Sequence, residues 1–131
     1  MKGILLMSHG TLCYGMINSL EMLGADTDKV KAIALFQDTG LDDYAQEISG
    51  ALEELDDGEG VFVITDIISG TPFNQVCHFY EKKNIEIITG MNLPMVIFAI
   101  HYRDYYSLEE LGNRCIDEAK NCMVTMKSIL Y

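Results

Sequence analysis

Four short apolar runs, separated by segments with helical periodicity, constrain the fold of this chain more than any other feature. The runs are GILLMS (3–8), VKAIALF (30–36), GVFVIT (60–65) and IEIIT (85–89). They have the length of strands, and because most of their positions are apolar, both faces of each strand are expected to be buried. Such strands are typical of a parallel sheet covered by helices. The sequence therefore predicts an α/β fold, doubly wound, with helices on both faces.

The segments between the runs predict the helices. Apolar residues recur at helical spacing over 12–23 and over 41–55, where acidic residues occupy the other face of the second segment. A third helix is expected over 72–82, because Thr71 offers a capping hydroxyl and Pro72 suits the first turn. Each of these helices would connect two parallel strands.

The last third of the chain is less regular. Pro94 is expected to start a short helix, and Ser107 with Glu110 forms a capping box for a longer one. The tail CMVTMKSIL (122–130) is compatible with a strand or with a continued helix. Apolar and polar residues alternate over 124–127, which favours the strand.

Composition limits the partners and the location. The 131 residues are expected to form a single domain, 1–131, and 49% of them are hydrophobic, which suits a packed core. The formal net charge of -11 excludes nucleic acid as a favoured partner. The longest apolar stretch, 93–100, is too short to span a membrane, and neither a signal peptide nor a CxxC pair is evident. We expect a cytoplasmic protein.

Candidate reactive residues follow the first and third runs. In open α/β sheets, ligands bind beyond the carboxyl ends of the strands. His9 and Asp66 take these positions, so their side chains face each other if the two strands are neighbours. An aspartate that accepts from one imidazole nitrogen leaves the other nitrogen free as a nucleophile. Small residues that would let an anion approach the backbone lie beside them, namely Gly10, Ser69, Gly70 and Thr71.

Other chemistries fit this sequence less well. A lone histidine at a strand end is often an ordinary polar residue, so the interpretation of His9 depends on Asp66. His78 and His101 have no partner at a suggestive spacing. No second ligand pair accompanies His9 and Cys13, so no metal is expected. No GxGxxG, GxxxxGK[ST] or GxSxG motif occurs, and no cofactor is expected. Phosphoryl transfer through His9 is the chemistry that remains.

Three stretches of the chain resemble a known family. They are GILLMSHGT at the first run, VFVITDIISGTPFN at the third and ITGMNLPM at the fourth. Together they resemble the IIA components of the mannose family of the bacterial phosphoenolpyruvate-dependent sugar phosphotransferase system, over essentially the full length. The resemblance implies a mostly parallel sheet of order 2-1-3-4. It also implies a homodimer in which a fifth, antiparallel strand, here the tail, is exchanged between subunits.

The resemblance further implies a function. His9 would accept a phosphoryl group from the carrier protein HPr and pass it to a IIB component during sugar uptake, with membrane IIC and IID components involved indirectly. The other positions that match the family's site are Asp66, Gly70, Thr71, Asn92 and Pro94. The aspartate would orient the histidine, the glycine and threonine would help to hold the phosphoryl oxygens, and the last two would form a second loop near the site.

Two other functions are compatible with the same fold. The phosphotransfer subunit of dihydroxyacetone kinase shares it and carries a similar histidine, whereas a regulatory interaction module would need no reactive His9. The chain also departs from the family, whose members often carry tryptophan and glycine where Ile68 and Ser69 stand here. Ile67 and Ile68 are equally compatible with a partner-docking rim and with the core.

Overall fold

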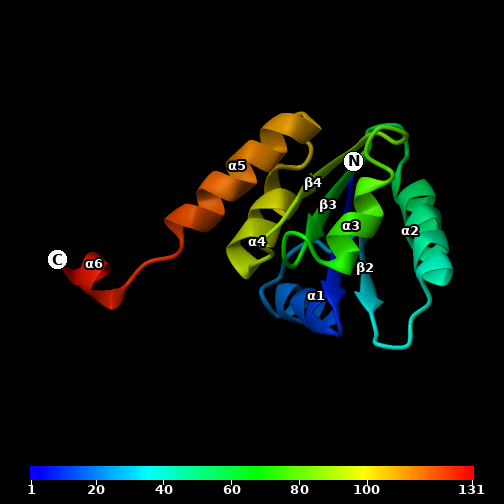
Figure 1. The fold of residues 1–131 in the computed structure, drawn as a ribbon. Coiled ribbons are helices and arrows are strands. Elements are labelled where there is room, and N and C mark those ends of the chain that lie inside the picture. Colours follow the sequence, from blue (N-terminus) through cyan, green and yellow to red (C-terminus); the bar gives the residue numbers. More distant parts are fainter.

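The computed structural model describes all 131 residues, which form an alternating series of strands and helices (Figure 1). The strands are β1 (Gly3–His9), β2 (Val30–Leu35), β3 (Val61–Thr65) and β4 (Ile85–Ile88). The helices are α1 (Leu12–Met22), α2 (Leu41–Leu55), α3 (Thr71–Cys77), α4 (Leu93–Tyr102), α5 (Leu108–Asn121) and α6 (Met126–Leu130). All of the strands and helices predicted ahead of the tail are present.

The four strands form one parallel sheet in the order β2-β1-β3-β4. This confirms the order 2-1-3-4 that the resemblance implied. β1 lies between β2 and β3, and Met7 of β1 is in register with Ile33 on one side and Thr65 on the other. The carboxyl ends of β1 and β3 therefore lie side by side at one edge of the sheet.

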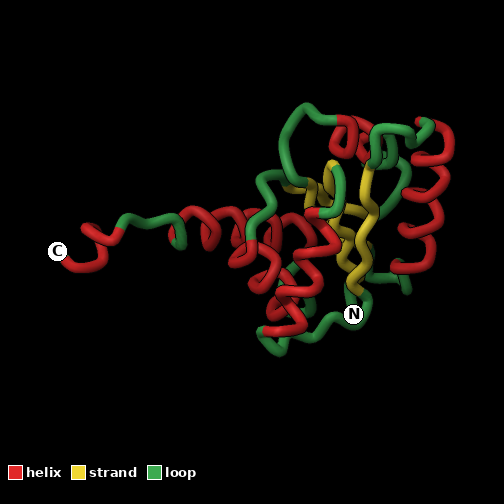
Figure 2. The backbone as a smooth tube through the Cα atoms, turned by 90° about the horizontal axis from the view of Figure 1, so that it is seen from below, coloured by secondary structure: helices red, strands yellow, loops and turns green.

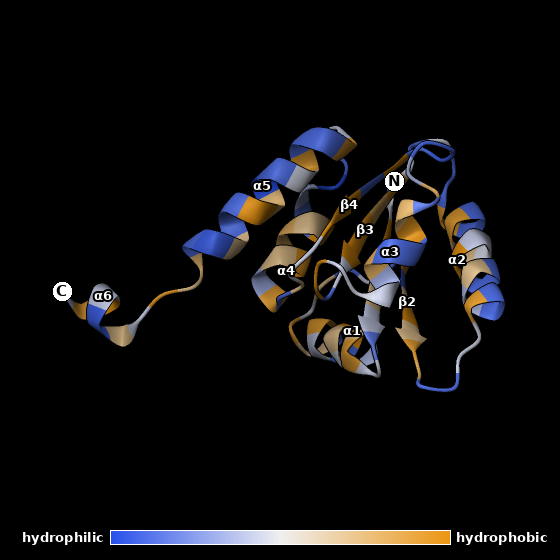
Figure 3. Cartoon of the chain, in the orientation of Figure 1, coloured by the Kyte–Doolittle hydropathy of each residue, from blue (hydrophilic) through white to orange (hydrophobic).

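Helices cover both faces of the sheet (Figure 2). Successive side chains of a strand point to opposite faces, so Leu5 and Met7 pack against α2 and α3, whereas Ile4 and Leu6 belong to the core formed with α1, α4 and α5. The strands are apolar and the outer faces of α2 and α5 are hydrophilic (Figure 3). This confirms the doubly wound α/β architecture.

The third helix is shorter than predicted. α3 ends at Cys77, and the following N–H groups bond to carbonyls three residues back, as His78 does to Gln75. These tighter turns replace the helical pattern expected as far as residue 82. The N-cap is Gly70, with no side-chain hydrogen bond, so Thr71 is the first helical residue and not the cap.

The two later helices begin as expected. Pro94 is in the first turn of α4. Ser107 is the N-cap of α5, where its Oγ accepts the N–H of Glu110 at 3.2 Å. None of the helices combines the length and the apolar character that crossing a membrane requires.

The tail is not a strand in this structure, which corrects the prediction. Residues 123–125 have no regular structure, and the exposed helix α6 projects away from the sheet (Figure 1). Thr125 caps this helix, since its Oγ1 accepts the N–H of Ser128 at 3.1 Å and its carbonyl accepts the Ser128 hydroxyl at 2.8 Å. Local hydrogen bonds prevail because no strand of the same chain pairs with the tail. Strand exchange with a second subunit remains a prediction.

Candidate functional site

His9 and Asp66 meet at the carboxyl edge of the sheet. His9 is the last residue of β1, and Asp66 directly follows the neighbouring strand β3. The imidazole Nδ1 lies 2.8 Å from Oδ2 of the aspartate. The histidine side chain is 47% exposed and that of the aspartate 10% exposed, so the ring is accessible while the carboxylate is shielded. The structure thus brings together the two residues that the sequence pairs.

The surroundings of Asp66 favour its ionised form. Its Oδ2 also accepts the backbone N–H of His9 at 2.8 Å, and its Oδ1 accepts the N–H of Ile67 at 2.8 Å. Partial burial acts to raise the pKa of Asp66, but the hydrogen bonds from His9 and Ile67 outweigh it and hold that pKa below the ordinary value. Because an ionised carboxylate only accepts, Nδ1 carries the proton and Nε2 presents a lone pair.

The turn after β1 fixes the backbone on one side of the ring. Gly10 has φ +58, a left-handed conformation that glycine adopts without strain. Its N–H donates to the carbonyl of Leu35, the last residue of β2, at 2.7 Å. Together with Phe36 and Gln37, these residues and His9 line a recess of about 380 Å³. The imidazole therefore borders an open hollow at the edge of the sheet.

The turn after β3 also lies against the ring. A Cβ placed on Gly70 would lie 2.7 Å from Cε1 and 3.3 Å from Nε2 of His9, so a larger residue here would displace the ring from its present position. Ser69 has φ +67, a left-handed conformation that residues other than glycine seldom adopt. Thr71, half-buried, begins α3 directly after this turn. Gly70 thus lies beside Nε2, and the predicted residues Ser69 and Thr71 flank it in the turn.

The loop after β4 reaches Asp66 through its backbone. The N–H of Gly90 donates to the Asp66 carbonyl, and the N–H of Met91 donates to the Thr65 carbonyl, each at 3.1 Å. Asn92 instead caps α4, with Oδ1 accepting the N–H of Met95 at 3.0 Å. Asn92 therefore ends the loop that supports the site and Pro94 follows in the first turn of α4, and neither side chain forms a hydrogen bond with His9 or Asp66.

The two isoleucines after Asp66 lie on the surface. Ile67 is 55% exposed and Ile68 is 66% exposed, in the turn that leads from Asp66 to Gly70. This excludes the interpretation that they are core residues. Leu12, 52% exposed, and Phe36, 45% exposed, are apolar residues of the neighbouring turns at the same edge.

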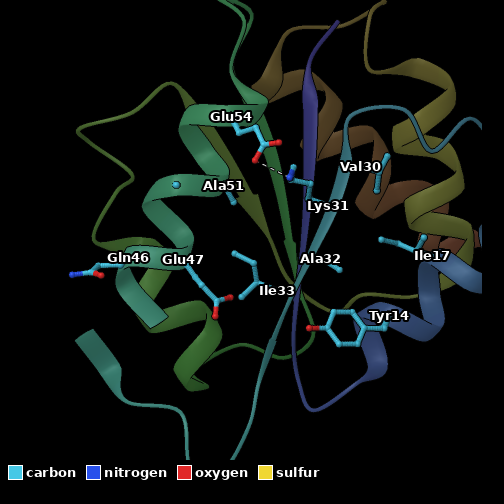
Figure 4. A pocket seen from close by; sticks show the side chains of 11 residues that line it. Tyr14, Ile17, Val30, Lys31, Ala32, Ile33, Gln46, Glu47, Ala51 and Glu54 are labelled. Carbon is cyan, nitrogen blue, oxygen red and sulfur yellow. Dashed lines mark ion pairs between the residues drawn. The ribbon is translucent and has the colours of Figure 1, made fainter. Parts of the chain in front are cut away.

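The remaining sites considered lie apart from this edge. His78, after α3, and His101, near the end of α4, are both exposed. A larger recess of about 540 Å³ lies against β2, between α1 and α2, where Lys31 and Glu54 form an ion pair at 2.8 Å (Figure 4). Neither His9 nor Asp66 lines it.

One contributor to the local geometry was not anticipated from the sequence. Ser8 is fully buried, and its hydroxyl bonds to the backbone on the far side of His9, at Gly10 and Cys13. The available signal was a serine that ends an otherwise apolar strand immediately before the histidine.

Comparison with known proteins identifies the family. The model of the EIIA-man family, described as PTS system fructose IIA component, matches residues 3–116. This chain belongs to the EIIA-man family. It is a IIA component of the phosphotransferase system, as the three stretches around the first, third and fourth strands predicted.

Individual members of the EIIA-man family support this assignment. The PTS system fructose-specific EIIA component of Bacillus subtilis is 24% identical over 114 residues, covering 86% of this chain and 78% of the relative. The PTS system mannose-specific EIIAB component of Escherichia coli K12 is 26% identical over 127 residues, covering 95% of this chain and 39% of the relative. The chain thus spans less than half of that longer protein.

Solved structures agree with the EIIA-man fold. The PTS IIA protein associated with the fucose utilization operon of Streptococcus pneumoniae superposes with a TM-score of 0.84 at 28% identity, over 99% of this chain and 96% of that one. The EIIA component from Streptococcus agalactiae has a TM-score of 0.86 at 24% identity, over 98% and 99%.

Proposed function

We propose that this EIIA-man component carries a phosphoryl group on His9 during sugar uptake, with HPr as the donor and a IIB component as the acceptor. The observation that carries the proposal is the 2.8 Å hydrogen bond between Nδ1 of His9 and Asp66. It fixes the tautomer in which Nε2 is the nucleophile, on a ring that is partly exposed to a docking partner.

The transfer step follows from this arrangement. The Nε2 lone pair attacks the phosphorus held by HPr, a nitrogen–phosphorus bond forms, and the bond to the donor atom breaks with its electron pair returning to HPr. Asp66 compensates the positive charge that develops on the imidazole, so it acts as a positioning and electrostatic residue. The same step run toward IIB regenerates the free histidine. Positioning and electrostatics dominate such transfers, so no cofactor is needed.

The walls of the site suit a phosphoryl group beside Nε2. Gly10 lines the recess beside His9, and the turn of Ser69, Gly70 and Thr71 meets the ring at Gly70. We assign these four residues to the binding of phosphoryl oxygens through their N–H groups and hydroxyls. Asn92 and Pro94 act indirectly, because they start α4 directly after the loop in which Gly90 bonds to the carbonyl of Asp66.

The surroundings of His9 fit a protein partner. Exposed apolar residues follow the strands at this edge of the sheet, namely Leu12 at the start of α1, Phe36 after β2 and Ile68 after β3. A net charge of -11 would steer a basic partner surface toward this protein. We assign this rim to HPr and to IIB, which would dock in turn, and the membrane IIC and IID components would act after IIB. A homodimer with exchanged tails is part of the same proposal.

Labelling with phosphoenolpyruvate, enzyme I and HPr tests the proposal. The wild-type protein is expected to take up phosphate on His9, and His9→Ala is expected to abolish labelling without loss of the fold. Asp66→Asn should still be labelled, but much more slowly, because the nucleophile remains while its orientation and charge compensation are lost. His78→Ala and His101→Ala serve as matched controls that should label as the wild type does.

Three outcomes would contradict the assignment. Undiminished labelling of His9→Ala, or phosphate mapped to His78 or His101, would remove His9 from the proposed role. A wild-type protein that binds HPr but takes up no phosphate would favour a regulatory interaction module. Unimpaired labelling of Asp66→Asn would remove only the orienting role of the aspartate.

A further inference from the structure

Ser8 is buried at the carboxyl end of β1, where the alternation of the strand points its side chain to the opposite face of the sheet from that of His9. Its relative exposure is 0%, and its hydroxyl both donates and accepts a hydrogen bond. Oγ donates to the carbonyl of Gly10 at 3.1 Å and accepts the N–H of Cys13 at 2.9 Å. A single hydroxyl thus joins the end of the strand, the turn after His9 and the first turn of α1.

These bonds replace an ordinary helix cap. The N-cap residue of α1 is Thr11, which makes no side-chain capping hydrogen bond. The N–H of Cys13, which such a cap would satisfy, bonds to Ser8 instead. The bond to the Gly10 carbonyl holds the residue whose φ is +58, so Ser8 controls the sharp bend of the chain directly after His9.

The bend affects the ring because the backbone N–H and the imidazole of His9 both form hydrogen bonds with one oxygen atom of Asp66. Oδ2 of Asp66 accepts both the backbone N–H and Nδ1 of His9, each at 2.8 Å. Both bonds form only if the backbone at residue 9 has one particular orientation. A change in the peptide planes on either side of His9 would move the ring relative to the carboxylate.

We propose that Ser8 is a positioning residue for the phosphoryl-transfer reaction, and that its hydroxyl locks the β1–α1 turn so that the His9 imidazole is held on Asp66 in the Nδ1–H tautomer. This inference rests on the proposed function of His9. Ser8 makes no contact with the phosphoryl group, and it acts entirely through the backbone of residues 9 and 10.

Three variants test the proposal. Ser8→Ala removes the hydroxyl, and Ser8→Thr keeps it. Ser107→Ala is the matched control, because Ser107 also accepts an N–H at a helix start, at 3.2 Å, but on α5 and away from His9. Both alanine variants are expected to lower the melting temperature, since each loses a capping bond.

The readout that a purely structural role would not change is the imidazole tautomer, observed by nitrogen-15 NMR of the unphosphorylated protein. Ser8→Ala should shift the population of His9 from the Nδ1–H toward the Nε2–H tautomer and slow labelling by HPr about tenfold or more. Ser8→Thr should restore both properties, and Ser107→Ala should leave both unchanged.

The proposal is overturned if Ser8→Ala retains the wild-type tautomer and labelling rate, or if Ser107→Ala slows labelling to the same extent. A Ser8→Thr variant that melts as the wild type does but behaves like Ser8→Ala would also overturn it. Because the tautomer is measured without any phosphoryl donor, the role of Ser8 in holding the ring is tested even if the wild-type protein takes up no phosphate.

Discussion

Gly70 and the imidazole of His9 are packed so closely that no side chain fits between them. The atom that a Cβ on Gly70 would meet, Cε1 at 2.7 Å, belongs to a ring that can rotate away. Gly70→Ala is therefore expected to leave the melting temperature nearly unchanged while breaking the hydrogen bond to Asp66. Phosphoryl labelling should fall by about tenfold or more, because the nucleophile loses its orientation.

The control for this variant is Gly50→Ala on α2, where an added Cβ meets nothing within 4 Å. It should raise the free energy of unfolding by up to about 1 kcal/mol, because alanine favours a helix over glycine, and should not affect labelling. Normal labelling of Gly70→Ala would show that the ring tolerates the displacement.

The depressed pKa of Asp66 makes stability depend on pH. The pKa of Asp66 in the folded state lies below its ordinary value of 3.8, so the carboxylate stabilises the fold above that pH. This contribution is lost as the pH falls through the lower, folded-state value. The free energy of unfolding of the wild type should therefore decrease more steeply below about pH 4 than that of Asp66→Asn. Asp38→Asn, in the exposed loop before α2, is the charge-matched control. Equal slopes for all three proteins in denaturant titrations would contradict this expectation.

The exposed position of Ile68 predicts a defect in docking without a defect in folding. Ile68→Asp places a charge on the proposed rim, and should slow phosphoryl transfer from HPr while the melting temperature stays nearly constant. Met22→Asp is the matched control, since Met22 is 84% exposed at the end of α1, away from the carboxyl edge. A large loss of stability in Ile68→Asp, or equal slowing in Met22→Asp, would argue against a local docking role.

Truncation of the C-terminal tail tests whether two subunits exchange their tails. Its apolar residues are largely exposed, with Met126 at 68% and Ile129 at 65%, so truncation after Lys120 removes little intrachain packing. If the tails are exchanged, the full-length chain should sediment as a dimer whose melting temperature rises with concentration. The truncated chain should be a less stable monomer with no such dependence. A truncated chain that remains folded and dimeric would refute the exchange.

The sequence alone was sufficient to predict the strands of the sheet and the two central residues of the site, His9 and Asp66. Apolar runs such as residues 60–65 have few alternatives to a buried strand, and a parallel sheet places the residues after neighbouring strands at one edge. His9 and Asp66 could therefore be paired on the condition that their two strands are neighbours. The strand order itself came from the family resemblance, because local patterns contain no information about which strands are adjacent.

The remaining features depend on contacts that no local pattern specifies. α3 was expected to continue past Cys77, but the final turns tighten into hydrogen bonds between residues three apart. The alternating tail resembled a strand, yet Thr125 and Ser128 satisfy each other locally. Gly70 was predicted to help hold the phosphoryl oxygens. Its close approach to the imidazole of His9 was not predicted. Such distances arise only when separate turns converge.

The oxygen shared between the backbone and the ring of His9 has a practical consequence. Any change in charge on the imidazole alters the carboxylate that also receives the His9 amide proton. The chemical shift of the His9 amide therefore reports the charge of the imidazole, and it can be measured without modifying the histidine. It would allow each step of the proposed phosphoryl loading and unloading to be followed in real time in the intact protein, with the neighbouring amides serving as the reference.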